Sequence, residues 1–151
     1  MSDFTTRIAD AIKEAMKARD QDSLNVLRGL KSALMNAAIE KGGAGSTLED
    51  SEAMAVVRKQ VKQREESART YRDGGRPELA EKEEAEIRIL STFLPAALGE
   101  AELAALIDAA IAETGATGKA QMGAVMKAAS AAAAGRVDGK TLSQAVAARL
   151  S

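Results

Sequence analysis

The sequence contains no cysteine and no histidine among its 151 residues. Without cysteine, the chain forms no disulfide and offers neither a thiolate nucleophile nor a thiolate metal ligand. Without histidine, it lacks the side chain that most often acts as a general base near neutral pH, which is also the commonest zinc ligand. Catalysis would have to rest on carboxylates, lysines, hydroxyl groups or the single tyrosine. The sequence therefore predicts no metal site, no cofactor and no catalytic residue.

Proline and aromatic residues are almost as scarce. Two prolines occur, and aromatic residues make up 2% of the chain, namely Phe4, Tyr71 and Phe93. Alanine instead fills 33 of the 151 positions. Alanine is the best helix former, whereas strands favour aromatic and β-branched residues. We therefore expect an all-α fold.

Long apolar runs and a strong charge of one sign are also missing. No apolar run approaches the roughly 20 residues of a membrane-spanning helix. The first residues lack the charged-then-apolar plan of a secretory signal. Twenty-one basic residues balance 22 acidic ones, so the net charge is −1. These features predict a cytoplasmic protein with no membrane partner, and they exclude a globally basic one.

Apolar residues recur at helical spacing throughout the chain, and the periodic segments are separated by breaks that are polar or contain glycine or proline. The pattern predicts a four-helix N-terminal part over residues 1–95 and a smaller three-helix part over residues 96–151. The segment Pro95 to Gly99 is the expected boundary. The third and fourth helices should form an antiparallel hairpin about the Gly74-Gly75 turn.

Side-chain signals mark the starts of the second, third and fourth expected helices. Asp22 or Ser23 can cap the second helix. Ser46 and Glu49 have the spacing of a capping box for the third helix. Pro77 suits the first turn of the fourth helix, where its missing N–H has no cost.

The hairpin pairs a basic helix with an acidic one. Seven basic residues lie from Arg58 to Arg76, and five glutamates lie from Glu78 to Glu86. Mutual neutralisation is the structural interpretation, and exposed pairs of this kind contribute only about 0–1 kcal/mol each. Arg64 differs because it falls on the apolar stripe, where an unpaired charge is costly. We expect Glu83, Glu86 or both to hold it in a structural ion pair, and a contact with a partner molecule is the alternative.

A second basic set occurs near helix ends and glycines in the C-terminal part. Cations, backbone N–H groups and helix N-termini suit contact with phosphate, and nearby glycines allow close approach of the backbone. A solvated surface explains the same charges, and the shortage of aromatic residues makes base stacking an unfavoured mode. The residues predicted to contact RNA are Lys119, Lys127, Arg136 and Lys140, with Gly123 and Gly135.

One segment resembles a phosphate-binding loop only superficially. Gly115-Ala116-Thr117-Gly118-Lys119 lacks the G-x-x-x-x-G-K-[ST] spacing, and no strand is expected before it. Paired carboxylates occur on the fourth helix, but an acid–base pair also requires a pocket and separated pKa values. The sequence therefore identifies no catalytic constellation.

Several segments together resemble the GatB/YqeY family, of the YqeY type. The matching segments run in order along almost the whole chain, with Phe93 where the family has tyrosine and Val137 where it has alanine. They are KQVKQREES at residues 59–67, Tyr71 followed by GRPEL at 75–79, Glu86 and Leu90 followed by FLP at 93–95, MGAVM at 122–126, and GRVDGK at 135–140.

The resemblance implies four N-terminal helices and three C-terminal helices. The module is also similar to the tail of the B subunit of glutamine-dependent aminoacyl-tRNA amidotransferases, which contacts the outer corner of tRNA. Family-level descriptions therefore read carbon–nitrogen ligase with glutamine as amido donor. The kinase-like site and the glutaminase of those enzymes have no counterpart in this sequence.

Three functions remain open at this point. The first is a non-catalytic module that binds tRNA or assists a tRNA-charging or tRNA-amidating enzyme. The second is a helical protein–protein interaction adaptor with a groove around Pro95. The third is an intrinsic amidotransferase or amidase, which the absence of histidine and cysteine disfavours.

Overall fold

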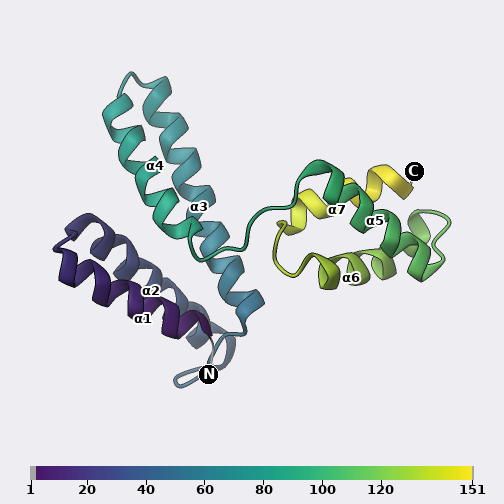
Figure 1. Cartoon of the computed structure of the whole chain (residues 1–151), viewed down its shortest axis with the longest axis horizontal. Coiled ribbons are helices and arrows are strands. Elements are labelled where there is room, and N and C mark those ends of the chain that lie inside the picture. Colours follow the sequence, from purple (N-terminus) through teal and green to yellow (C-terminus); the bar gives the residue numbers. More distant parts are fainter. Residues whose placement is uncertain (1–2, 151) are drawn as a thin grey trace. The chain divides into compact units, whose positions relative to one another are not determined.

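The computed structural model describes residues 3–150, which contain α-helices, one short 3-10 helix and no strand. The expected all-α fold is therefore confirmed. The chain divides into two compact units, one ending at Leu94 and the other beginning at Pro95. Figure 1 labels the helices of both units.

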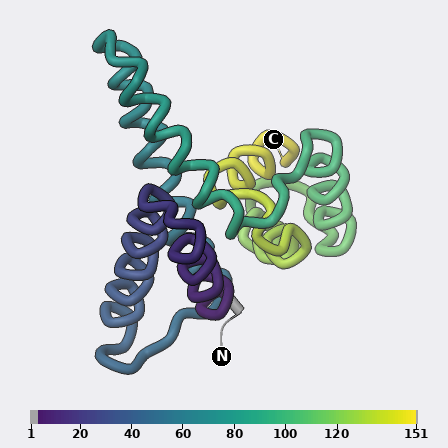
Figure 2. The backbone as a smooth tube through the Cα atoms, turned by 60° about the vertical axis from the view of Figure 1, so that its left-hand side comes forward, coloured from purple at the N-terminus to yellow at the C-terminus, as the bar shows by residue number. Residues whose placement is uncertain are grey.

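The N-terminal unit consists of two antiparallel helix pairs, α1 with α2 and α3 with α4 (Figures 1 and 2). The helices are α1 (Asp3–Ala18), α2 (Gln21–Gly42), α3 (Asp50–Asp73) and α4 (Pro77–Ser91). All four contribute to one buried cluster, because each places its 3-to-4-spaced apolar stripe toward the others. The most deeply buried members include Ile8, Leu30, Val57 and Leu90.

The helix α3 continues beyond the shared core as an arm with α4, and the turn between them lies at the far end from α1 and α2 (Figure 2). Gly75 adopts a left-handed φ of 73° in this turn, a conformation that glycine reaches without steric cost. Pro77 occupies the first turn of α4 as expected. The residues of α3 and α4 near this turn contribute less to the apolar core than the residues next to α1 and α2. Charged side chains therefore make up much of the surface of the arm.

Two of the expected helix caps are wrong. The N-cap of α2 is Asp20, whose carboxylate accepts from the Ser23 N–H at 3.1 Å. The helix α3 begins at Asp50 after a Glu49 N-cap, and the Glu49 N–H donates to Glu52 Oε1 at 3.0 Å. In each case a carboxylate satisfies a free backbone N–H at the helix start, and the pattern of capping residues alone did not fix the register.

The C-terminal unit is a three-helix cluster with its own core. Its helices are α5 (Glu100–Thr114), α6 (Met122–Ala133) and α7 (Gly139–Leu150), and the 3-10 helix η1 (Lys119–Gln121) precedes α6. The predicted apolar positions Ile107, Val125, Leu142 and Val146 are all at most 2% exposed. The unit therefore buries a core independent of that of α1 to α4.

Candidate nucleic-acid interface

Three of the predicted RNA-contacting lysines lie on separate elements of the C-terminal unit. Lys119 is the first residue of η1, Lys127 lies in the middle of α6, and Lys140 lies in the first turn of α7. All three side chains are exposed. Within residues 3–150 none of their ammonium groups forms a hydrogen bond or an ion pair. Their charges are therefore available to an external anion.

The exposed face of α6 carries almost only small side chains, and we call it the smooth face. Opposite the buried positions Val125 and Ala129, the exposed face carries one charge, Lys127, and otherwise only small residues. Those small residues are Gly123, Ala124, Ser130 and Ala131. Small side chains allow another molecule to come close to a helix. The phosphate backbone of a nucleic acid can therefore approach the axis of α6 and contact Lys127.

Gly123 and Gly135 have different roles in the fold. A Cβ atom placed on Gly123 would meet no atom within 4 Å, and its φ is not left-handed. The fold therefore does not require glycine at position 123, although glycine inside a helix costs about 0.5–1 kcal/mol relative to alanine. Gly135 has a φ of 83°, after Ala134 at 48°, and so is explained by the turn that ends α6.

Arg136 holds its own unit together. Its Nε donates to the Ala96 carbonyl at 2.9 Å, and its Nη2 lies 3.2 Å from Glu102 Oε2. Its backbone carbonyl also accepts from the Leu98 N–H at 3.0 Å. Arg136 thus ties the segment before α5 to the turn between α6 and α7. Its guanidinium makes two contacts inside the protein, whereas the ammonium groups of the three lysines make none in the described structure.

A second ion pair joins two helices of the C-terminal unit, and no local sequence pattern predicts it. Arg149 of α7 binds Asp108 of α5 through two nitrogen–oxygen contacts. The Arg149 hydrogen bond lowers the pKa of Asp108 from its usual value. The two residues are 41 positions apart, so only the packing of α5 against α7 brings them together.

The predicted structural ion pair of Arg64 involves one of its two expected partners. Arg64 Nε lies 3.8 Å from Glu86 Oε1, and both side chains are about 20% exposed. No hydrogen bond or ion pair joins Arg64 to Glu83 in the described part of the chain. The guanidinium donates instead to the Gln60 side chain at 2.8 Å, one helical turn earlier, while Nε itself has no hydrogen-bond partner.

Neutralisation within the hairpin is incomplete. Arg72 pairs with Glu84 of α4, and Arg76 pairs with Glu78 at the turn. The Glu84 hydrogen bond raises the pKa of Arg72. The other cations of α3 form no ion pair or hydrogen bond through their side chains in the described structure. They are Arg58, Lys59, Lys62 and Arg69.

Arg7 is a further contact that the sequence did not reveal. Its guanidinium lies 5.4 Å from the ring centroids of both Phe4 and Phe93. It also donates to the Thr92 carbonyl at 2.8 Å. Arg7 therefore joins α1 to the segment that follows α4, and its aromatic partner there, Phe93, is 86 positions away in the sequence.

Metal-binding side-chain groups and membrane-spanning helices are both missing from the described residues. Residues 3–150 contain no group of three or more acidic side chains placed to hold a metal ion. No described helix is long and apolar enough to cross a membrane. The positions that stand out are thus surface cations and one smooth helix face.

Comparison with known proteins gives two matches. A sequence model of the family described as "Yqey-like protein" matches residues 5–150. A curated protein of the fungus Pyrenophora tritici-repentis (strain Pt-1C-BFP), named "Altered inheritance of mitochondria protein 41, mitochondrial", is 28% identical over 108 residues. The aligned region covers 70% of this chain and 58% of that relative, so the chain spans less than two thirds of the relative's length.

Proposed function

The chain belongs to the YqeY-like protein family, and from this premise we propose that it is a non-catalytic module that binds tRNA or assists a tRNA-charging or tRNA-amidating enzyme. The similarity of the module to the tail of the amidotransferase B subunit supports this role. The carbon–nitrogen ligase chemistry of those complexes would then belong to other subunits. We place the function in the cytoplasm, the compartment that the sequence predicts, while the name of the fungal relative assigns that longer protein to mitochondria.

The observation that carries the proposal is the set of three lysines without intramolecular partners. Lys119, Lys127 and Lys140 are exposed and unpaired in the described structure, and Lys127 lies on the smooth face of α6. Cations of this kind fix a protein on a nucleic-acid backbone through phosphate contacts, which carry no sequence information. The protein would therefore recognise the shape of tRNA. Gly123 supports the same role, because its open position lets a phosphate or sugar approach the helix.

The test is a binding titration of the whole protein with bulk tRNA at two salt concentrations. Release of counterions from about three phosphates predicts a slope of about −2 to −3 in log affinity against log salt. Lys127→Glu and Lys140→Glu should each weaken binding and reduce the slope. Lys31→Glu is the matched control, because Lys31 is an exposed lysine of α2 in the other unit and has no ion pair or hydrogen bond in the described structure.

Two results would refute the proposal. One is tRNA affinity that is unchanged in Lys127→Glu and Lys140→Glu. The other is an equal loss in Lys31→Glu, because binding would then reflect overall charge. Arg136 is a poor test residue on its own, since replacing it also removes contacts that hold the C-terminal unit together.

A protein-interaction adaptor is the second candidate, and one observation favours it. Met35 and Ile39 follow each other by one turn on α2 and are 56% and 51% exposed. Two large apolar side chains on one helix face are typical of a surface that a partner helix covers. Recovery of one protein with the chain after nuclease treatment, and its loss in Met35→Ser with Ile39→Ser, would favour this function. Recovery that disappears with nuclease would favour RNA.

A further inference from the structure

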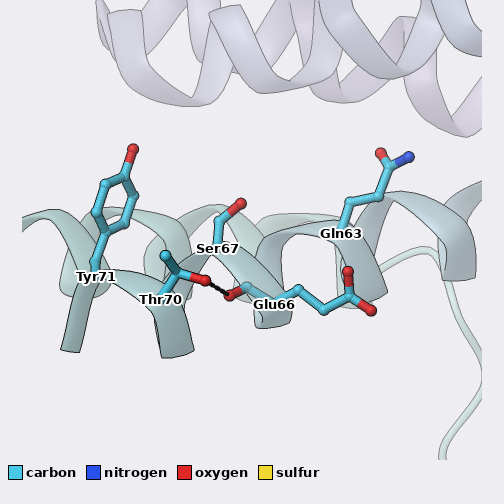
Figure 3. A pocket seen from close by; sticks show the side chains of 5 residues that line it. All are labelled: Gln63, Glu66, Ser67, Thr70 and Tyr71. Carbon is cyan, nitrogen blue, oxygen red and sulfur yellow. Dashed lines mark hydrogen bonds between the residues drawn. The ribbon is translucent and has the colours of Figure 1, made fainter. Parts of the chain in front are cut away.

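An open depression of about 490 Å³ lies along one side of α3, and its walls come from that single helix (Figure 3). Gln63 and Tyr71 are about two turns apart, and Glu66 points about 140° away from Tyr71 around the helix axis. A small molecule in the depression would therefore touch only part of the lining, whereas ligand sites enclose most of the ligand surface. The lining is Gln63, Glu66, Ser67, Thr70 and Tyr71.

The segment that joins the two units is held on its N-terminal side. The Arg7 guanidinium donates to the Thr92 carbonyl at 2.8 Å and lies over the Phe93 ring. Phe93 is buried, and Leu94 packs against the same core. The Leu94 N–H also donates to the Ser91 carbonyl at 3.1 Å. The backbone is thus attached to the N-terminal unit as far as Leu94.

The same segment is held again directly after Pro95. The Ala96 carbonyl accepts from Arg136 Nε at 2.9 Å, and the Leu98 N–H donates to the Arg136 carbonyl at 3.0 Å. Gly99 is the N-cap of α5. Of the five residues from Pro95 to Gly99, the last four are therefore attached to the C-terminal unit.

Pro95 lies between these two attachments and has little backbone freedom of its own. It is exposed and forms no hydrogen bond in the described structure. Its ring fixes φ near −65°, and its Cδ atom restricts the preceding residue, Leu94, to extended backbone conformations. Two of the torsions that would turn one unit against the other are therefore already set. The torsions that remain are ψ of Pro95 and φ of Ala96.

We propose that Pro95, together with the contact of Arg136 with Ala96, forms a stiff joint that limits rotation between the two units to these two torsions. Arg136 then acts as a positioning residue for the C-terminal unit. A partner that engages both units loses less conformational entropy with such a joint than with a flexible linker. The joint does not depend on what the protein binds, so it stands apart from the proposed function.

The absence of cysteine makes the joint measurable in the whole protein. Lys31→Cys and Glu113→Cys allow one spin label on α2 and one on α5. Both positions are exposed, and neither side chain forms an ion pair or a hydrogen bond in the described structure. Pulsed electron paramagnetic resonance gives the distribution of distances between the two labels. The width of this distribution reports the rotation that the joint permits.

Pro95→Gly is the main variant, and Ala97→Gly is its matched control. Pro95→Gly should widen the distribution about twofold, because glycine adopts φ of either sign and no longer restricts Leu94. Ala97→Gly adds similar freedom between Ala96 and Leu98, which Arg136 holds on both sides. It should therefore leave the width unchanged. Arg136→Ala removes the hold on Ala96 and should also widen the distribution.

Two results would overturn the inference. One is a distribution in Pro95→Gly that is no wider than that of the labelled protein with Pro95 intact. The other is equal widening in Ala97→Gly, because residues 96–98 would then be free of the C-terminal unit. If Arg136→Ala unfolds the C-terminal unit, Pro95→Gly still decides, since Pro95 is exposed and belongs to neither core.

Discussion

Replacement of Arg136 by alanine should loosen the C-terminal unit before it affects any RNA contact. The side chain provides a charge-assisted hydrogen bond to the Ala96 carbonyl and an ion pair with Glu102. A hydrogen bond to a charged group contributes about 1.5–3 kcal/mol when shielded, and an exposed ion pair contributes about 0–1 kcal/mol. The Arg136 side chain is 39% exposed. Solvent screening therefore reduces the expected total to about 1–2 kcal/mol.

Amide hydrogen exchange on the whole protein measures this effect where it should occur. A loss of about 1–2 kcal/mol speeds exchange about 5- to 30-fold in the amides that open with the unit. We expect this acceleration in α5, α6 and α7, and unchanged protection in α1 to α4. Lys140→Ala is the control, because Lys140 lies four residues after Arg136, at the start of α7, and has no ion pair or hydrogen bond in the described structure.

A double-mutant cycle separates the two contacts of Arg136. Glu102→Ala removes only the ion pair, so it should cost less than Arg136→Ala and show a coupling of about 0.5 kcal/mol with it. Unchanged protection of α5 to α7 in Arg136→Ala would refute the structural role. An equal acceleration in Lys140→Ala would show that loss of charge, and not of these contacts, is responsible.

Three further predictions concern stability. Arg7→Met should lower the free energy of unfolding by about 1–2 kcal/mol in chemical denaturation, because it removes two cation–π contacts and a carbonyl contact while keeping an apolar stem; an unchanged midpoint would contradict this. Gly123→Ala should raise the free energy of unfolding by about 0.5–1 kcal/mol, since a Cβ meets no atom there, and a destabilised variant would show an unseen steric conflict. The ion pair of Asp108 with Arg149 lowers the pKa of Asp108 below its usual 3.8, so its stabilisation is complete above that value and is lost as the pH falls through the lowered pKa. Asp108→Asn should therefore weaken the acid dependence of thermal unfolding below pH 4, and an unaltered pH profile would count against the pair.

The helices themselves follow from local properties of the sequence. The 3-to-4 spacing of residues such as Val125 and Ala129, or Leu142 and Val146, places apolar side chains on one face, and burial of that face stabilises the helix. Gly75 and Pro77 mark the turn before α4 because their backbone preferences fit a turn and a first helical turn. These signals act over a few residues, so the all-α fold can be predicted without knowing how the helices pack.

Helix caps show where local reasoning becomes ambiguous. Asp20, Asp22 and Ser23 are all suitable cap residues, and neighbouring positions of this kind compete for the same backbone N–H groups. The structure assigns the cap to Asp20. For α3 the sequence predicted Ser46 as the N-cap, whereas the structure has Glu49. The ion pair of Lys41 with Glu52 joins the end of α2 to the first turn of α3, next to this cap. Part of that choice is therefore tertiary.

The sequence by itself determined the helices, their apolar faces and which residues carry charge. Only the tertiary structure decided which charges remain available, because an ion pair depends on distances between elements that are remote along the chain. Arg136 looked equivalent to Lys140 in the sequence, yet packing of the C-terminal unit gives Arg136 internal partners and leaves Lys140 none.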